Sequence, residues 1–165
     1  MSDTPTYDVQ SFDIVTDAIM ELLNDFPGLS TGEKIAYAML GDTQGIAMFP
    51  VSGAVVESDV VDIIGHETQI CLYPFYVIYR AYGLSESNKA KAKEWLDRLG
   101  SWLEKQTITV GESTYKLDSY PELSGDREFL SVKRQNPAHL DSVNDNMSEN
   151  WAISISARYR NEFDL

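Results

Sequence analysis

The chain has 165 residues, enough for a sizeable hydrophobic core, and residues 1–165 are expected to form a single domain. Its 26 acidic and 13 basic residues give a formal net charge of −13, which argues against binding nucleic acid through the phosphates. The lone cysteine, Cys71, excludes an internal disulfide framework. The polar, acidic start and the lack of a long apolar run in the sequence lead us to expect neither a secretory leader nor a membrane span.

A first helix is predicted over residues 9–25. Its apolar residues recur every three or four positions, as on one face of an amphipathic helix: Phe12, Val15, Ile19, Leu22, Leu23 and Phe26. Ser11 or Asp8 is expected to cap its start, and Pro27-Gly28 is expected to end it. Residues 1–8 before it are polar and are expected to be flexible.

Short strands are predicted at residues 33–40, 45–49 and 57–64, each bounded by turn-forming residues. A longer strand is predicted over residues 67–82, which are β-branched or aromatic almost without interruption. Gly65-His66 between the last two segments predicts a hairpin. Because strands rarely exceed about 10 residues, the long one is expected to protrude, bend or break, and Pro74 is the expected break.

The long strand is apolar on both faces when it is read with a period of two. One face carries Ile70, Leu72, Pro74, Tyr76 and Ile78, and the other carries Cys71, Tyr73, Phe75, Val77 and Tyr79. Two interpretations stay open at this point. Either the strand is central beneath a layer of helices, or part of an apolar face is covered by another subunit, because monomers rarely expose large contiguous apolar patches.

A second helix is predicted over residues 88–105, with Ser85 or Ser87 as its N-cap. Gly100 inside it costs about 1 kcal/mol relative to alanine, which indicates close packing. The lysines on its other side are interpreted as a solvated face. The apolar residues again form one stripe: Ala92, Trp95, Leu96, Leu99, Trp102 and Leu103.

The last third of the chain is predicted to hold strands at residues 107–110, 129–135 and 151–163, the last with one buried face. Residues 136–150 are polar, contain Pro137 and are predicted to form a flexible loop. Only Leu140, Val143 and Met147 could dock this loop against a partner, so they are the candidate assembly contacts. The elements together predict an α+β fold, a mixed, mainly antiparallel sheet with two amphipathic helices packed on one face.

The sequence has no pattern typical of catalysis or of cofactor binding. His66 and His139 lack further ligands at zinc-site spacing, and Cys71 is expected to be a buried hydrophobe rather than a nucleophile. Phosphate-binding loops and nucleophile-elbow motifs are absent from the sequence. We therefore expect no catalytic, cofactor-binding or metal site. Two carboxylate pairs are expected by chance in so acidic a chain: Asp13 with Asp17, and Asp59 with Asp62.

Four segments, which together span residues 9–163, carry a resemblance to a known family: DIVTDAIMELLNDFPGL, YVIYRAYG, KAKEWLDRLGSWLEKQ and WAISISARYRNEF. In their order they resemble the tail terminator family of long-tailed phages, also described as head-to-tail joining or minor capsid proteins. Residues 111–125 and the loop at 136–150 depart from the family pattern.

The resemblance implies a structural virion protein rather than an enzyme, assembled in the host cytoplasm as a homo-hexameric ring at the head-proximal end of the tail. Such a ring caps the tail tube protein and joins it to the head-completion (stopper) protein. DNA would pass through its lumen without specific binding, and no cofactor or membrane is implied. An acidic lumen that repels phosphate agrees with this role. The alternative is a small cytoplasmic enzyme or ligand-binding α+β domain with a pocket between helices and sheet.

Overall fold

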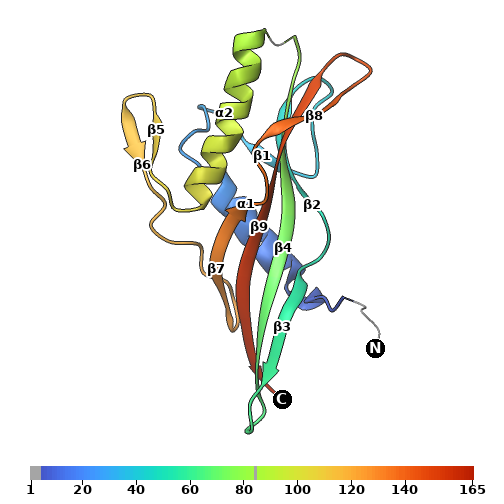
Figure 1. The fold of residues 1–165 in the computed structure, drawn as a ribbon, viewed down its shortest axis with the longest axis vertical. Helices are drawn as coiled ribbons and strands as arrows, with labels where there is room; N and C mark the ends of the chain where they lie inside the picture. Colours follow the sequence, from blue (N-terminus) through green and yellow to red (C-terminus); the bar gives the residue numbers. More distant parts are fainter. Residues whose placement is uncertain (1–4, 84) are drawn as a thin grey trace.

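Two long antiparallel strands, β4 (His66–Ala81) and β9 (Glu149–Asp164), form the axis of the fold in a computed structural model that describes residues 5–83 and 85–165. They pair along their whole length, from His66 opposite Asp164 to Ala81 opposite Glu149. Figure 1 shows this ribbon running along most of the long axis of the molecule. Each strand has 16 residues, about three times the usual length, and shorter strands support it on its outer edge.

The shorter strands complete a mixed, mainly antiparallel sheet, as predicted. Strands β2 and β3 pair with β4, and strands β7 and β8 pair with β9, all antiparallel, while β1 runs parallel to β2. Strands β5 and β6 form a small hairpin of their own. The bounds are β1 (Ile35–Tyr37), β2 (Gly45–Pro50), β3 (Val55–Val61), β5 (Ile108–Val110), β6 (Ser113–Tyr115), β7 (Arg127–Arg134) and β8 (His139–Val143).

Pro74 does not break β4, contrary to the prediction from the sequence. It lies opposite Ser156 of β9, and the strand continues on both sides of it. The Pro74 carbonyl accepts a hydrogen bond from the Val51 N–H at 3.1 Å, so the proline nitrogen points to that same edge of the strand. At that edge β2 has just ended and β3 has not yet begun. The missing donor therefore falls in a gap between two neighbouring strands and breaks no ladder bond.

Both helices pack on one face of the sheet, as predicted from their apolar stripes. Helix α1 (Phe12–Asn24) follows a 3-10 turn at Val9–Ser11, and Asp8 makes no side-chain capping bond there. Helix α2 (Glu86–Leu103) is capped by Ser85, whose hydroxyl accepts a hydrogen bond from the Asn88 N–H. The core beneath them joins α1, α2, β4 and β9: Val15, Ile19, Leu22, Leu23, Leu96, Leu99, Trp102, Cys71, Tyr73, Phe75, Val77, Ile153, Ile155 and Tyr159.

The segment 136–150 is a hairpin and not a long loop, so that prediction is wrong. Strand β8 pairs with β9, and the turn closes through hydrogen bonds from the Asn144 N–H to the Ser148 carbonyl and from the Met147 N–H to the Asn144 carbonyl. The Asn146 side chain donates to the Asp42 carbonyl at 2.8 Å, which ties the turn to the β1–β2 connection. A flexible loop was expected because the segment has few apolar side chains that could anchor it. Hydrogen bonds of its backbone and of its asparagine side chains hold it in place instead.

The segment before α1 is also anchored where the structure describes it, in contrast to the expected flexibility of residues 1–8. Residues 1–4 lie outside the described residues. Tyr7 forms an antiparallel bridge with Val55. Asp8 is only 8% exposed, and its carboxylate accepts hydrogen bonds from Arg127 at 3.2 Å and from the Tyr159 hydroxyl at 2.8 Å. A buried, paired carboxylate of this kind fixes the segment on the sheet.

Candidate assembly surface

The second face of β4 is apolar and neither helix covers it. Its residues are partly exposed and lie outside the core formed with the helices: Ile70, Leu72, Pro74, Tyr76 and Ile78. Tyr76 near its centre is 40% exposed. On β9 the positions opposite this face, from Ile78 to Ile70, are Ala152, Ser154, Ser156, Arg158 and Arg160. Small side chains therefore border the strip at one end and two arginines border it at the other. A partly exposed apolar strip is typical of a surface on which another polypeptide packs.

The β3–β4 hairpin carries a second apolar feature at the end of the molecule near the C-terminus (Figure 1). Its turn is closed by a hydrogen bond from the Asp62 N–H to the His66 carbonyl at 2.9 Å. The Asp62 carboxylate also accepts the N–H groups of His66 and Ile64, and these bonds lower the pKa of Asp62, the one from His66 most. Ile63 and Ile64 at the tip are 103% and 85% exposed. The turn therefore holds two β-branched apolar side chains in water.

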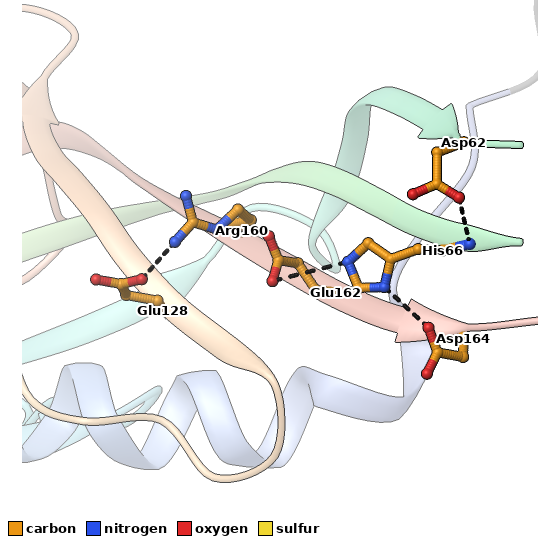
Figure 2. A network of polar contacts seen from close by, with 6 residues as sticks. All are labelled: Asp62, His66, Glu128, Arg160, Glu162 and Asp164. Carbon is orange, nitrogen blue, oxygen red and sulfur yellow. Dashed lines mark hydrogen bonds and ion pairs between the residues drawn. The ribbon is translucent and has the colours of Figure 1, made fainter. Parts of the chain in front are cut away.

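Carboxylates lie along the strands next to this turn (Figure 2). His66 Nδ1 lies 2.9 Å from the Asp164 carboxylate, and Nε2 lies 3.9 Å from Glu162. The hydrogen bond to Asp164 is the main cause that raises the pKa of His66. Arg160 pairs with Glu128 at 2.6 Å and with Glu162 at 3.3 Å. The network links the ends of β4 and β9 to the start of β7 and makes this end of the molecule acidic.

The three predicted assembly contacts lie together on the β8–β9 hairpin, at the other end of the molecule from the β3–β4 turn (Figure 1). Leu140, Val143 and Met147 are 42%, 53% and 68% exposed. Met147 has a φ of 68°, a left-handed conformation that is uncommon for a side chain of its size. The two ends of the β4–β9 ribbon thus each present exposed apolar side chains.

The residues considered in the sequence as candidates for catalysis or metal binding do not form a common site in the fold. His139 Nδ1 lies 3.2 Å from the Pro137 carbonyl, far along the chain from His66 and its carboxylates. Cys71 is buried, and burial raises the pKa of its thiol to about 11. Asp59 shares a hydrogen bond with Glu67, which raises the pKa of Glu67, rather than pairing with Asp62. Among the described residues no group of three or more His, Cys, Asp or Glu could hold a metal ion.

A cavity of about 650 Å³ opens at the end of β4 remote from the β3–β4 turn. Its lining comes from the α1–β1 connection, the β1–β2 connection, the start of β2 and the end of β4 with Tyr82 after it. Tyr79 and Tyr82 supply aromatic surface, and Lys34 and Arg80 supply positive charge. Such a combination suits an apolar segment that carries carboxylates.

Sequence reasoning missed the exposed Ile63-Ile64 pair. Residues 57–64 were predicted to be one strand, whereas β3 ends at Val61 and the two isoleucines form the turn. The available signal was Gly65, which has a φ of 87° and marks the end of a tight turn. Two isoleucines directly before a turn glycine are poor turn formers and indicate a role in contacts.

No protein-family model matches this chain, and no curated protein matches it at a significant level. No helix in residues 5–83 and 85–165 is long and apolar enough to cross a membrane. The fold class is α+β, and its surface carries three apolar features that the chain's own helices leave open: the second face of β4, the β3–β4 turn and the β8–β9 hairpin.

Proposed function

We propose that the chain is a structural virion protein, a ring-forming tail terminator that caps the tube of a phage tail and joins it to the head-completion protein. The observation that carries this proposal is the apolar face of β4 that neither helix covers. Covering apolar surface contributes roughly 25 cal/mol per Å². A neighbouring polypeptide in the assembled particle is the natural cover for a strip of this length.

Two further features support the proposal. The net charge of −13 suits a passage for DNA, because acidic walls repel phosphate and let the duplex slide without adhering. The exposed apolar residues at the two ends of the β4–β9 ribbon suit a protein that other polypeptides of an assembled particle contact at both ends.

The experiment is a tail-capping assay with the tail tube protein of the same phage. Tubes polymerised with the chain present are expected to carry it as a hexameric ring at one end, visible by electron microscopy. Tyr76→Lys, which places a charge on the apolar face, is expected to abolish binding to tube ends. Tyr115→Lys is the matched control, since Tyr115 is also 40% exposed but lies on the separate β5–β6 hairpin. A chain that stays monomeric and never binds tube ends contradicts the proposal.

A further inference from the structure

We infer that the β3–β4 tip of one subunit docks into the 650 Å³ cavity at the far end of β4 in a second copy of this chain. This inference deepens the proposed function, on which it rests for the closed ring, by naming the two surfaces that join neighbouring subunits. The β3–β4 tip is defined here as residues 62–65 together with Leu165.

The β3–β4 tip is an apolar knob on a hydrogen-bonded support. Leu165 is 78% exposed, and its N–H donates to the Gly65 carbonyl at 2.8 Å, which places a third apolar residue beside Ile63 and Ile64. The turn is closed by the backbone bonds and by the Asp62 carboxylate. A preorganised turn loses little conformational freedom on binding. Most of the free energy gained by burying its exposed side chains therefore contributes to affinity.

The cavity complements this knob through two aromatic side chains and through its charge. Tyr79 and Tyr82 provide aromatic surface within a lining that is otherwise mostly polar, and aromatic side chains are enriched where protein contacts are strongest. Its lining holds two cations, Lys34 and Arg80, against one carboxylate, Glu33. In four other cavities of the described surface, carboxylates equal or outnumber cations.

Charge favours this pairing over other partners of the tip. The carboxylates of Asp59, Asp62, Glu162 and Asp164 lie near the tip and complement a cavity that has an excess of cations. A symmetric contact between two tips would bring these carboxylates together, and an anionic membrane would repel them. In a chain with a net charge of −13, a local excess of cations is the feature that a neighbouring acidic tip can recognise.

Distance requires that the contact join two copies. The tip precedes β4 and the cavity lies at its end, so they are separated by a strand of 16 residues, roughly 50 Å at about 3.4 Å per residue. One chain cannot fill its own cavity. After docking, each copy still has one free tip or one free cavity. Such a head-to-tail arrangement forms a ring when the rotation from copy to copy closes.

Cysteine cross-linking of the full-length chain tests the contact directly. Cys71 is buried and burial raises the pKa of its thiol to about 11, so cysteines introduced at the surface react selectively. An Ile63→Cys chain is mixed with a Tyr82→Cys chain of different mass, so that the mixed disulfide dimer can be distinguished from either homodimer. This mixed dimer is expected to form at least tenfold faster than the one between Ile63→Cys and Tyr115→Cys. Equal rates, or faster dimerisation of Ile63→Cys alone, would overturn the inference.

Complementation in light scattering provides the second measurement. Ile63→Ser/Ile64→Ser destroys the tip, and Lys34→Glu/Tyr82→Ala destroys the cavity, and each variant alone is expected to be monomeric. Their mixture is expected to form 1:1 dimers, because each supplies the surface the other lacks. The matched control, Val51→Ser/Leu130→Ser, removes two exposed apolar side chains elsewhere and is expected to assemble like wild type.

The outcomes separate this inference from the proposed function. Rings of the tip variant that still cap tail tubes would overturn the docking contact and leave the tail-terminator role standing. A tip–cavity cross-link in a chain that never binds tube ends would leave the contact standing and contradict the role. Binding of wild type, but not of the tip variant, to phosphatidylserine vesicles without any cross-link between copies would assign the tip to a membrane and overturn the inference.

Discussion

Gly100 of α2 lies against the side chain of Arg134 of β7, so closely that a Cβ built on the glycine would stand 2.6 Å from the arginine Cγ. The Arg134 guanidinium is held in turn by Glu104, with Nε and Nη2 each 3.0 Å from a carboxylate oxygen. Alanine at this position would stabilise the helix by about 1 kcal/mol relative to glycine. The arginine side chain, however, occupies the space that the alanine methyl group would need. The close packing indicated by the sequence at Gly100 is confirmed.

Replacing Gly100 with alanine is expected to destabilise the protein. The new methyl group must displace Arg134 and press on Ile153, and overpacking of this kind costs about 1–3 kcal/mol, more than the gain in helix propensity. Urea unfolding measures the difference. Gly53→Ala is the control, since its Cβ would meet nothing closer than 3.7 Å, and it is expected to be neutral or up to about 1 kcal/mol more stable. A G100A variant as stable as wild type would contradict the packing.

The Glu104–Arg134 ion pair predicts a pH-dependent contribution to stability. Burial opposes ionisation of Glu104, but the hydrogen bonds from Arg134 outweigh it and lower the pKa of Glu104 below its usual 4.5. A depressed folded-state pKa contributes stability above pH 4.5 that is lost as the pH falls through the folded-state value. Glu104→Gln is expected to cost about 1.5–3 kcal/mol at pH 7. The gap to wild type should narrow below pH 4.5 in denaturant titrations.

The exposed Glu94 on the same helix provides the control for that measurement. Glu94→Gln is expected to change the free energy of unfolding by less than about 0.5 kcal/mol at either pH. If E104Q and E94Q behave alike at pH 7, the ion pair contributes nothing to stability.

Asp8 is expected to be the most sensitive carboxylate among the described residues outside the helices. Its partners Arg127 and Tyr159 are largely or fully buried, so Asp8→Ala leaves a buried guanidinium and a buried hydroxyl without this acceptor. Removing one partner of a buried ion pair costs about 3–5 kcal/mol. Thermal unfolding of Asp8→Ala measures this loss of stability. Asp17→Ala, at an exposed position of α1, is the control. A loss below about 1 kcal/mol would show that the segment before α1 is not anchored by Asp8.

His66 is expected to titrate above its ordinary pKa of 6.5, mainly because it hydrogen-bonds Asp164. A raised folded-state pKa contributes stability that is fully present below pH 6.5 and is lost as the pH rises through the folded-state value. Asp164→Asn is therefore expected to lower the pKa of His66, followed by NMR of the imidazole protons. Asp141→Asn, on the distant β8, is the control and should leave the His66 titration unchanged. An unchanged titration in D164N would exclude Asp164 as the cause.

The interpretation of the sequence succeeded where local periodicity is sufficient. The two helices, the long strand and the alternating last strand all follow from the spacing of apolar residues, because a helix or strand must turn one face to the core. The α+β class with both helices on one face follows from the same stripes. The apolar residues on the second face of β4 were also identified from the sequence, as were Leu140, Val143 and Met147, whose role in assembly stays a prediction.

Only the tertiary structure decided which polar groups meet and which apolar residues stay in water. Pro74 is accommodated because two neighbouring strands leave a gap at its nitrogen, and Asp8 is anchored by residues more than a hundred positions away. The hairpin at 136–150 depends on hydrogen bonds to partner strands and to Asp42. The exposure of Ile63 and Ile64 and the cavity with Tyr82 and Lys34 likewise depend on the tertiary structure. Spacing along a chain reports the face a residue shares with its neighbours, whereas pairing and exposure depend on segments that only the fold brings together.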